Sequence, residues 1–123
     1  MALLTLSYNI WFSDAKMDAR MRAIADIVAA RRPDVVALQE VTAAHWKLLS
    51  SHEVWAEFTW SRCPEDSRYY TMLGCRTDAV VLPERLQFRR SPFPRSGMGR
   101  DLLSVCVTKI SHFLEYPIPP PSR

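Results

Sequence analysis

A chain of 123 residues, of which 48% are hydrophobic and 24% charged, has the composition of one globular domain and not of a disordered segment. Its apolar runs are all shorter than the roughly 20 residues that a membrane-spanning helix needs, so no association with a membrane is expected. The formal net charge of +3 is compatible with an anionic partner, and many proteins without such a partner carry as much.

The N-terminal residues alternate between apolar and polar side chains, a pattern that predicts a half-buried β-strand. The apolar members of this strand are Leu4, Leu6, Tyr8 and Ile10. A capping signal, Ser13-Asp14, follows and predicts the start of a helix that ends at Arg31-Arg32, before Pro33. The apolar face expected for this helix consists of Met17, Met21, Ile24 and Val28.

The next segment, residues 34–40, contains a continuous apolar run, Val35 to Leu38, which is followed by Gln39-Glu40. A run without alternation favours a strand buried on both faces. Strand, helix and strand together predict a β-α-β unit, in which the two strands are parallel and joined by a right-handed crossover.

Thr42 can cap a second helix, which ends at Ser50-Ser51. Short strands are expected over residues 54–60, 69–73, 79–82 and 102–107, with a loop rich in Pro and Gly over 92–99. The Pro-rich residues 116–123 can form neither a helix nor a central strand. We therefore expect an α/β domain over residues 1–110 and a disordered tail over 111–123.

The cysteine content indicates a reducing compartment. Cys63, Cys75 and Cys106 are odd in number and lack C-x-x-C spacing, so neither a disulfide framework nor a zinc site is expected. The N-terminus has no basic segment followed by a long apolar run, so no signal peptide is expected, and the nucleus or the cytoplasm is the predicted location.

Two polar residues, Asn9 and Glu40, are expected at the carboxyl ends of the two parallel strands, where open α/β sheets form ligand crevices. A carboxylate at this place is a hard oxygen ligand suited to Mg²⁺, and an amide can bind a phosphate oxygen. The alternative is that both residues merely end strands, as polar residues often do.

Two ordered motifs favour the functional interpretation. Residues 6–12, Leu-Ser-Tyr-Asn-Ile-Trp-Phe, and residues 33–41, Pro-Asp-Val-Val-Ala-Leu-Gln-Glu-Val, resemble the first two strand motifs of the endonuclease/exonuclease/phosphatase superfamily. The resemblance implies the N-terminal half of a four-layer α/β sandwich. It also implies that Glu40 binds a divalent metal, Mg²⁺ or Mn²⁺, and that Asn9 contacts the phosphate.

Residues 68–73 and 98–103 resemble stretches of the 5′-tyrosyl-DNA phosphodiesterases, particularly the plant-like form. This resemblance implies a DNA-repair hydrolase of the nucleus that removes topoisomerase tyrosines from DNA 5′ ends, with single-stranded or tyrosyl-linked ends as partners. Tyr69, Tyr70 and Arg100 would then line the groove for the DNA end. The alternatives are that one tyrosine packs inward while the other lies on the surface, and that Arg100 is a solvated loop residue.

The motifs that complete the family's active site are absent from this sequence, which contains neither Gly-Asp-x-Asn nor Ser-Asp-His. We therefore expect a truncated half-domain that is inactive alone, with an apolar sheet face left open. One alternative is a non-catalytic module that binds nucleic acid or a protein partner, and another is a chain that does not fold stably. The oligomeric state is not predicted.

Other residues with potential chemistry have simpler interpretations. His45 and His52 are expected to be structural, because no second ligand lies at metal spacing. The arginines at 89, 90 and 95 could follow a DNA path but more often belong to a solvated loop.

Overall fold

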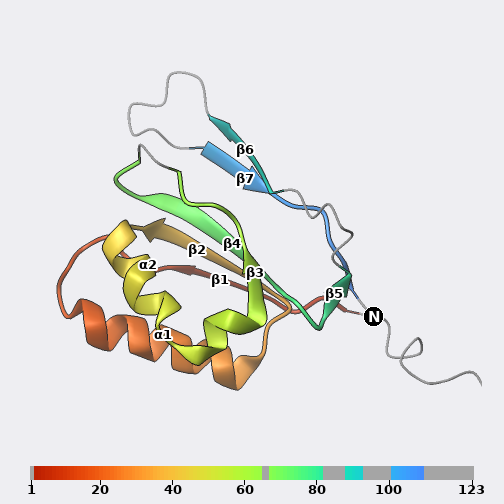
Figure 1. Cartoon of the computed structure of the whole chain (residues 1–123), viewed down its shortest axis with the longest axis horizontal. Helices are drawn as coiled ribbons and strands as arrows, with labels where there is room; N and C mark the ends of the chain where they lie inside the picture. Colours follow the sequence, from red (N-terminus) through yellow and green to blue (C-terminus); the bar gives the residue numbers. More distant parts are fainter. Residues whose placement is uncertain (1, 65–66, 82–87, 93–100, 110–123) are drawn as a thin grey trace, which may run out of the picture.

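The computed structural model describes residues 2–64, 67–81, 88–92 and 101–109. Its main sheet has four strands in the order β1-β2-β4-β3, and two helices, α1 and α2, cover one face of this sheet (Figure 1). These elements are β1 Thr5–Asn9, α1 Met17–Arg31, β2 Val35–Val41, α2 Ala43–Ser50, β3 Phe58–Trp60 and β4 Tyr70–Arg76.

Two smaller sheets follow the main one along the chain. A short 3₁₀ helix, η1 Glu53–Glu57, precedes β3, and the two small sheets pair the remaining strands. Their strands are β5 Val80–Val81 with β8 Thr108–Lys109, and β6 Arg89–Pro92 with β7 Asp101–Ser104. The β6–β7 hairpin lies next to β4, on the side away from α1 and α2 (Figure 1).

The predicted β-α-β unit is confirmed, since β1 and β2 are parallel and α1 connects them. β4 runs antiparallel to both β2 and β3, so β3 points in the same direction as β2. The carboxyl ends of β1, β2 and β3 therefore lie at one edge of the sheet. The α/β fold expected from the sequence is confirmed.

The predicted start of α1 is wrong in detail. The residue before the helix is Lys16, in the left-handed conformation and without a side-chain cap, whereas the Ser13 hydroxyl accepts a hydrogen bond from the Ala15 N–H in the preceding turn. The predicted end is correct, because Arg32 adopts a left-handed conformation, returns its N–H to the Val28 carbonyl, and precedes Pro33. Thr42 caps α2 as predicted and accepts the His45 N–H.

Two expectations about burial and strands also need correction. β2 is fully buried on one face only, through Val36, Leu38 and Val41, while Val35 and Ala37 on the other face are half-buried.

Residues 54–57 are helical and not part of a strand. Val54 and Trp55 are consecutive and 6% and 2% exposed, and neighbouring residues of a strand cannot both face a core that lies on one side of the sheet.

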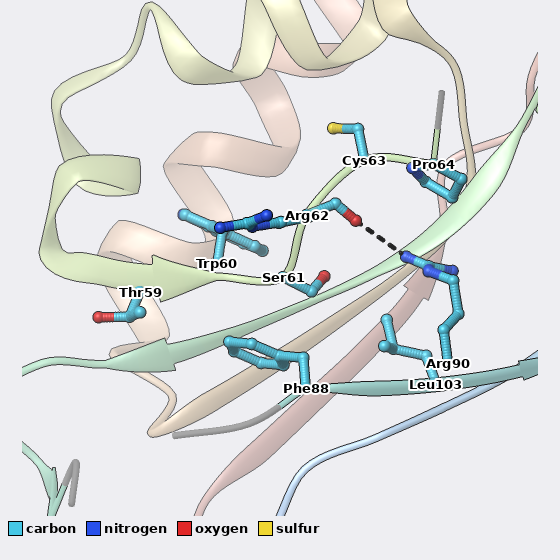
Figure 2. A pocket seen from close by; sticks show the side chains of 9 residues that line it. All are labelled: Thr59, Trp60, Ser61, Arg62, Cys63, Pro64, Phe88, Arg90 and Leu103. Carbon is cyan, nitrogen blue, oxygen red and sulfur yellow. Dashed lines mark hydrogen bonds between the residues drawn. The ribbon is translucent and has the colours of Figure 1, made fainter. Parts of the chain in front are cut away.

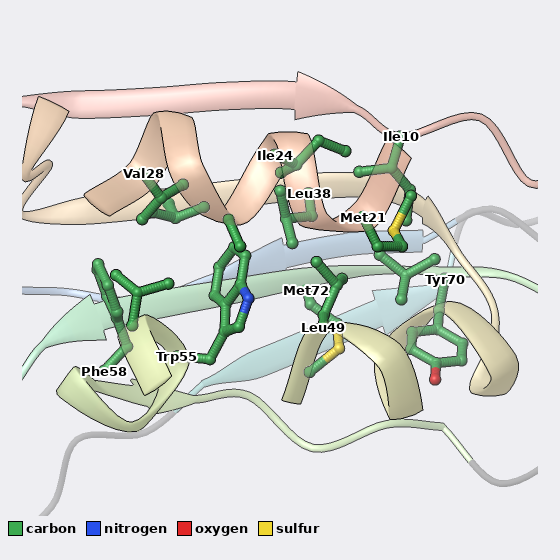
Figure 3. Packing of buried hydrophobic residues seen from close by; sticks show 14 residues of the cluster. Ile10, Met21, Ile24, Val28, Leu38, Leu49, Trp55, Phe58, Tyr70 and Met72 are labelled. Carbon is green, nitrogen blue, oxygen red and sulfur yellow. The ribbon is translucent and has the colours of Figure 1, made fainter. Parts of the chain in front are cut away.

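The core fills the space between the helices and the sheet (Figure 3). The α1 side chains Met21, Ile24 and Val28 face Leu38 of β2 and Met72 of β4, and all five are buried. The helical interpretation of the methionine spacing is confirmed for Met21, whereas Met17 is partly buried at the margin of the cluster. Asn9, at the carboxyl end of β1, is exposed, and Glu40 of β2 is only partly buried.

Several expectations lie partly or wholly outside the described residues. The strand expected at 69–73 is β4, and those expected at 79–82 and 102–107 are represented by β5 and β7. Of the loop expected at 92–99, Pro92 ends β6 and the rest lies outside the described residues, as does the whole Pro-rich tail. Within the part of the chain that the structure describes, no helix is long and apolar enough to cross a membrane.

Gly74 has no side chain, and the Trp60 indole packs directly over its backbone. A Cβ added at Gly74 would lie 2.6–2.7 Å from three atoms of the Trp60 indole, whose N–H is fixed by the Trp55 carbonyl at 2.9 Å. We expect Gly74→Ala to lower the free energy of unfolding by about 2 kcal/mol, because the ring must shift within a packed cluster. Urea unfolding at equilibrium measures this loss. An unchanged midpoint would show that the ring relaxes freely.

Candidate functional site

Asn9 and Glu40 lie together at the carboxyl edge of the sheet. Asn9 is opposite Gln39 in the parallel register, and the Ile10 N–H donates to the Gln39 carbonyl at 3.0 Å. Glu40 is therefore the next residue after the partner of Asn9. Asn9 is exposed and Glu40 is half-exposed, so a ligand in solvent can reach this edge of the sheet.

A β-bulge determines where Glu40 stands. Leu38 is opposite Met72 and Val41 is opposite Tyr70, so β2 carries one extra residue over this interval. Glu40 has φ 59°, which is the left-handed region. This conformation costs a non-glycine residue about 1–2 kcal/mol. Bulges of this kind re-aim side chains beside active sites, and here the bulge also returns Val41 to the buried face.

The hydrogen bonding of Asn9 determines which end of its amide faces the solvent. Its Oδ1 accepts the Trp11 N–H at 2.9 Å, which closes a turn at the end of β1. Because the oxygen is used in this turn, the amide NH₂ is left as a pair of donors. Such donors suit the oxygens of a phosphate.

The loop after β1 is held from two helices. The Arg20 guanidinium donates to the carbonyls of Ser13 at 2.9 Å and Ala15 at 3.0 Å, and also to those of Ile10 and Trp11. His45 is buried, its Nε2 is 3.0 Å from the Ser13 carbonyl, and its Nδ1 is 2.5 Å from Thr42 Oγ1. The carbonyl can only accept, so Nε2 is the donor in this contact, and in the neutral ring Nδ1 then accepts from the Thr42 hydroxyl. These contacts tie the loop beside Asn9 to the segment just after Glu40.

The structural interpretation of the two histidines is consistent with these contacts. His52 Nδ1 accepts the Val54 N–H at 3.2 Å and caps η1, and its Nε2 lies 3.5 Å from Asp26. Within the described ranges, no group of three His, Cys, Asp or Glu side chains is placed to hold a metal ion.

The adjacent tyrosines have different environments. Tyr70 is 7% exposed and belongs to the core cluster. Burial, together with a hydrogen bond to Cys63, raises the pKa of its phenol well above the usual range. Tyr69 is half-exposed, and its ring packs edge-on against Phe12 at a centroid distance of 5.2 Å. The structure therefore leaves only Tyr69 of the pair with a ring near the surface, and Arg100 lies outside the described residues.

Arg90 is not a solvated loop residue. Its Nη1 donates to both carboxylate oxygens of Asp101 at 3.1 and 3.2 Å, and its Nη2 donates to the Thr71 carbonyl at 2.7 Å and the Arg62 carbonyl at 3.3 Å. These bonds attach the β6–β7 hairpin to β4. Arg89 is exposed, as expected for a surface residue, and residue 95 lies outside the described ranges.

A cavity of about 580 Å³ lies between β3, the segment after it and the β6–β7 hairpin (Figure 2). Phe88 and Leu103 form its apolar side, while Thr59, Ser61 and Arg90 contribute polar groups. Ser61 Oγ already accepts the Leu73 N–H at 3.0 Å, and Arg90 is engaged as described above. This cavity includes neither Asn9 nor Glu40 and is therefore separate from the candidate site.

The donor set at the sheet edge fits one way of binding Mg²⁺. In proteins this ion is usually held by one or two carboxylates, with waters and substrate phosphate oxygens completing the octahedron. Glu40 supplies one carboxylate at an accessible edge, and Asn9 supplies donors for a phosphate. The described residues thus fit a site that the substrate itself must complete.

Sequence reasoning assigned no role to Trp11 and Phe12, although both lie in the quoted first motif. They are 52% and 45% exposed at the same edge as Asn9, and Tyr8 beside them is 47% exposed. A predicted alternation places Tyr8 on the covered face of β1, but β1 is an edge strand of the described sheet and α1 covers it incompletely. A pair of large aromatics directly after a strand was the available signal.

Comparisons with known proteins point to one family. The profile of the Endonuclease/Exonuclease/phosphatase family matches residues 6–123. Among solved structures, humanized D. rerio TDP2 with 14 mutations is 27% identical, with a TM-score of 0.77, over 87% of this chain and 42% of that one. D. rerio TDP2 complexed with single strand DNA product is 28% identical, with a TM-score of 0.76, over 87% and 41%.

TDP2 from C. elegans is 24% identical, with a TM-score of 0.70, over 84% of this chain and 30% of that one, and supports the fold alone. No curated protein sequence matches the chain. The chain spans less than half the length of these TDP2 structures. The neighbours agree with the resemblance to 5′-tyrosyl-DNA phosphodiesterases found in the sequence.

Proposed function

Because the chain belongs to the endonuclease/exonuclease/phosphatase family, we propose that Glu40 and Asn9 form the metal- and phosphate-binding part of a Mg²⁺-dependent phosphodiesterase that acts on DNA 5′ ends. The observation that carries this proposal is the bulge at Glu40, where a left-handed, non-glycine residue brings a carboxylate to the sheet edge. The similarity to D. rerio TDP2 complexed with single strand DNA product supports DNA as the polymer.

Each residue has a separate task in this proposal. Glu40 holds Mg²⁺ or Mn²⁺, and the Asn9 NH₂ group donates to a non-bridging phosphate oxygen. A bound divalent ion polarises the phosphoryl oxygen and stabilises the charge that develops there. Tyr69 offers the surface ring of the tyrosine pair to the DNA end, and Arg100 is proposed, from its motif alone, to pair with a phosphate.

We further propose that this chain binds a DNA end without hydrolysing it at a useful rate. The sequence has neither the Gly-Asp-x-Asn nor the Ser-Asp-His motif. It therefore lacks the general base and the charge-stabilising amide that these motifs supply. Groups that act as a unit lose nearly all of the rate when part of the unit is absent. Tyrosyl-linked DNA ends and a role in nuclear DNA repair are the proposed substrate and setting. The alternative is a module that binds nucleic acid or protein without a metal.

Fluorescence anisotropy with a labelled single-stranded oligonucleotide tests the proposal. For a 5′-phosphorylated oligonucleotide at low salt, we expect binding that is at least fivefold tighter in millimolar Mg²⁺ than in EDTA, because Glu40 would hold an ion whose charge attracts the phosphate. A 5′-hydroxyl oligonucleotide is the control and should show no such difference. Equal affinity for both oligonucleotides under both conditions would support the metal-free alternative. Rapid Mg²⁺-dependent release of the 5′ group would overturn the proposed inactivity.

A further inference from the structure

Trp11 stands apart from the other three tryptophans of the chain. Trp46 and Trp55 both pack against Trp60, with ring centroids 5.1 and 5.0 Å from it. Trp11 belongs to no such cluster and is 52% exposed. Its ring therefore adds little to the core, and burial does not explain a large aromatic residue at this place.

The backbone at Trp11 is also unfavourable for this residue type. Its φ of 60° lies in the left-handed region, where glycine or asparagine would fit with less strain. Three contacts hold Trp11 in this conformation. The Asn9 Oδ1 accepts its N–H, and the Arg20 guanidinium donates a hydrogen bond to its carbonyl. The same guanidinium stacks on the indole, with its Cζ 4.9 Å from the ring centroid. The indole is thus presented to solvent in a fixed position, directly beside Asn9.

A cavity of about 230 Å³ adjoins this ring. Asn9, Trp11 and Tyr8 line it on one side, and Arg20 and Ile27 line it from α1. Its size suits one planar ring with part of a sugar. A strand of nucleic acid whose phosphate meets Asn9 would have its neighbouring base next to this cavity.

We propose that Trp11 is the stacking platform for the terminal nucleobase of single-stranded DNA, with the cavity at Tyr8 and Ile27 receiving the edge of that base. Stacking on an aromatic face accepts any base, which suits an end-binding protein that does not read sequence. Arg20 beneath the indole fixes the ring and adds positive charge near the phosphodiester chain. This inference rests on the proposed function, since it assigns the base beside the phosphate that Asn9 and Glu40 hold.

The test uses three variants and one labelled oligonucleotide of deoxythymidine. Trp11→Asn introduces a residue that tolerates the left-handed conformation, so this variant should remain folded. Because the variant has no ring, it should bind the oligonucleotide about tenfold more weakly than the wild type. Trp11→Phe keeps an aromatic face and should bind within about threefold of the wild type. Leu4→Asn, at an apolar residue that is 52% exposed and precedes β1 at the end opposite to Asn9, is the matched control and should bind normally.

Tryptophan emission and an abasic oligonucleotide provide independent readings. DNA should quench the emission of the wild type, and Trp11→Phe should lose this quenching while retaining its affinity. An oligonucleotide whose terminal nucleotide is abasic should bind the wild type and Trp11→Asn equally. Full affinity of Trp11→Asn for the intact oligonucleotide would overturn the stacking role alone. Absence of DNA binding by the wild type would instead overturn the proposed function.

Discussion

Replacing Glu40 by glycine is expected to stabilise the protein and, at the same time, to make its binding of 5′-phosphorylated DNA independent of Mg²⁺. Glycine adopts the left-handed backbone of the bulge freely, whereas Glu40 and an alanine in its place both carry the Cβ strain. We expect the free energy of unfolding of the Glu40→Gly variant to be about 1 kcal/mol higher than that of the Glu40→Ala variant. Both variants should lose the tighter binding of 5′-phosphorylated DNA in Mg²⁺.

Arg32 offers a matched control for this prediction. It is also a non-glycine residue with positive φ, at 49°, but it caps the far end of α1 and is exposed. Arg32→Gly should gain a similar free energy of unfolding, because glycine is favoured at this helix position. Its Mg²⁺ dependence should stay that of the wild type. If Glu40→Gly proves less stable than Glu40→Ala, the strain at the bulge has been misassigned.

His45→Ala is expected to lower the free energy of unfolding by about 3 kcal/mol, more than His52→Ala does. The substitution leaves a cavity where a fully buried ring lay, and it removes the contact with the Ser13 carbonyl. Because Ser13 belongs to the loop that follows Asn9, we also expect faster amide hydrogen exchange at Trp11.

The control for this prediction is His52→Ala. His52 caps η1 through the Val54 N–H, away from the loop after β1, and its contact with Asp26 is largely exposed. We expect a loss of about 1 kcal/mol and unchanged exchange at Trp11. Urea denaturation and exchange measured by NMR compare the two variants. Equal effects of both variants on Trp11 exchange would show that His45 has no special link to the site.

The sequence predicted those parts of the fold that depend on local patterns. The strand β1, the helical spacing of α1 and the Thr42 cap all follow from short-range rules, and the structure confirms these elements. The half-buried face predicted for β1 is wrong in part, because Leu4 and Tyr8 are exposed. The same rules misplaced the start of α1 and made a strand of residues 54–57. In both cases tertiary contacts decide: Arg20 and His45 fix the Ser13 segment, and Trp55 turns into the core.

The candidate site divides in a similar way. Asn9 and Glu40 were predicted from strand ends and motif resemblance, and the parallel register places their segments side by side. The bulge at Glu40 could not be predicted, because it depends on the pairing of β2 with β4, which lies about thirty residues further along the chain. The positions of Trp11 and of the Arg90 attachment depend on contacts between elements that no local pattern encodes.

The most direct test of the central claim is a calorimetric titration of the protein with Mn²⁺, performed on the wild type, Glu40→Gly and Arg32→Gly. If the bulge presents a metal-binding carboxylate, the wild type and Arg32→Gly should each bind about one ion, weakly, and Glu40→Gly should show only the heat of dilution. Identical isotherms for the wild type and Glu40→Gly, or no binding by the wild type, would contradict the assignment of Glu40 as a metal ligand.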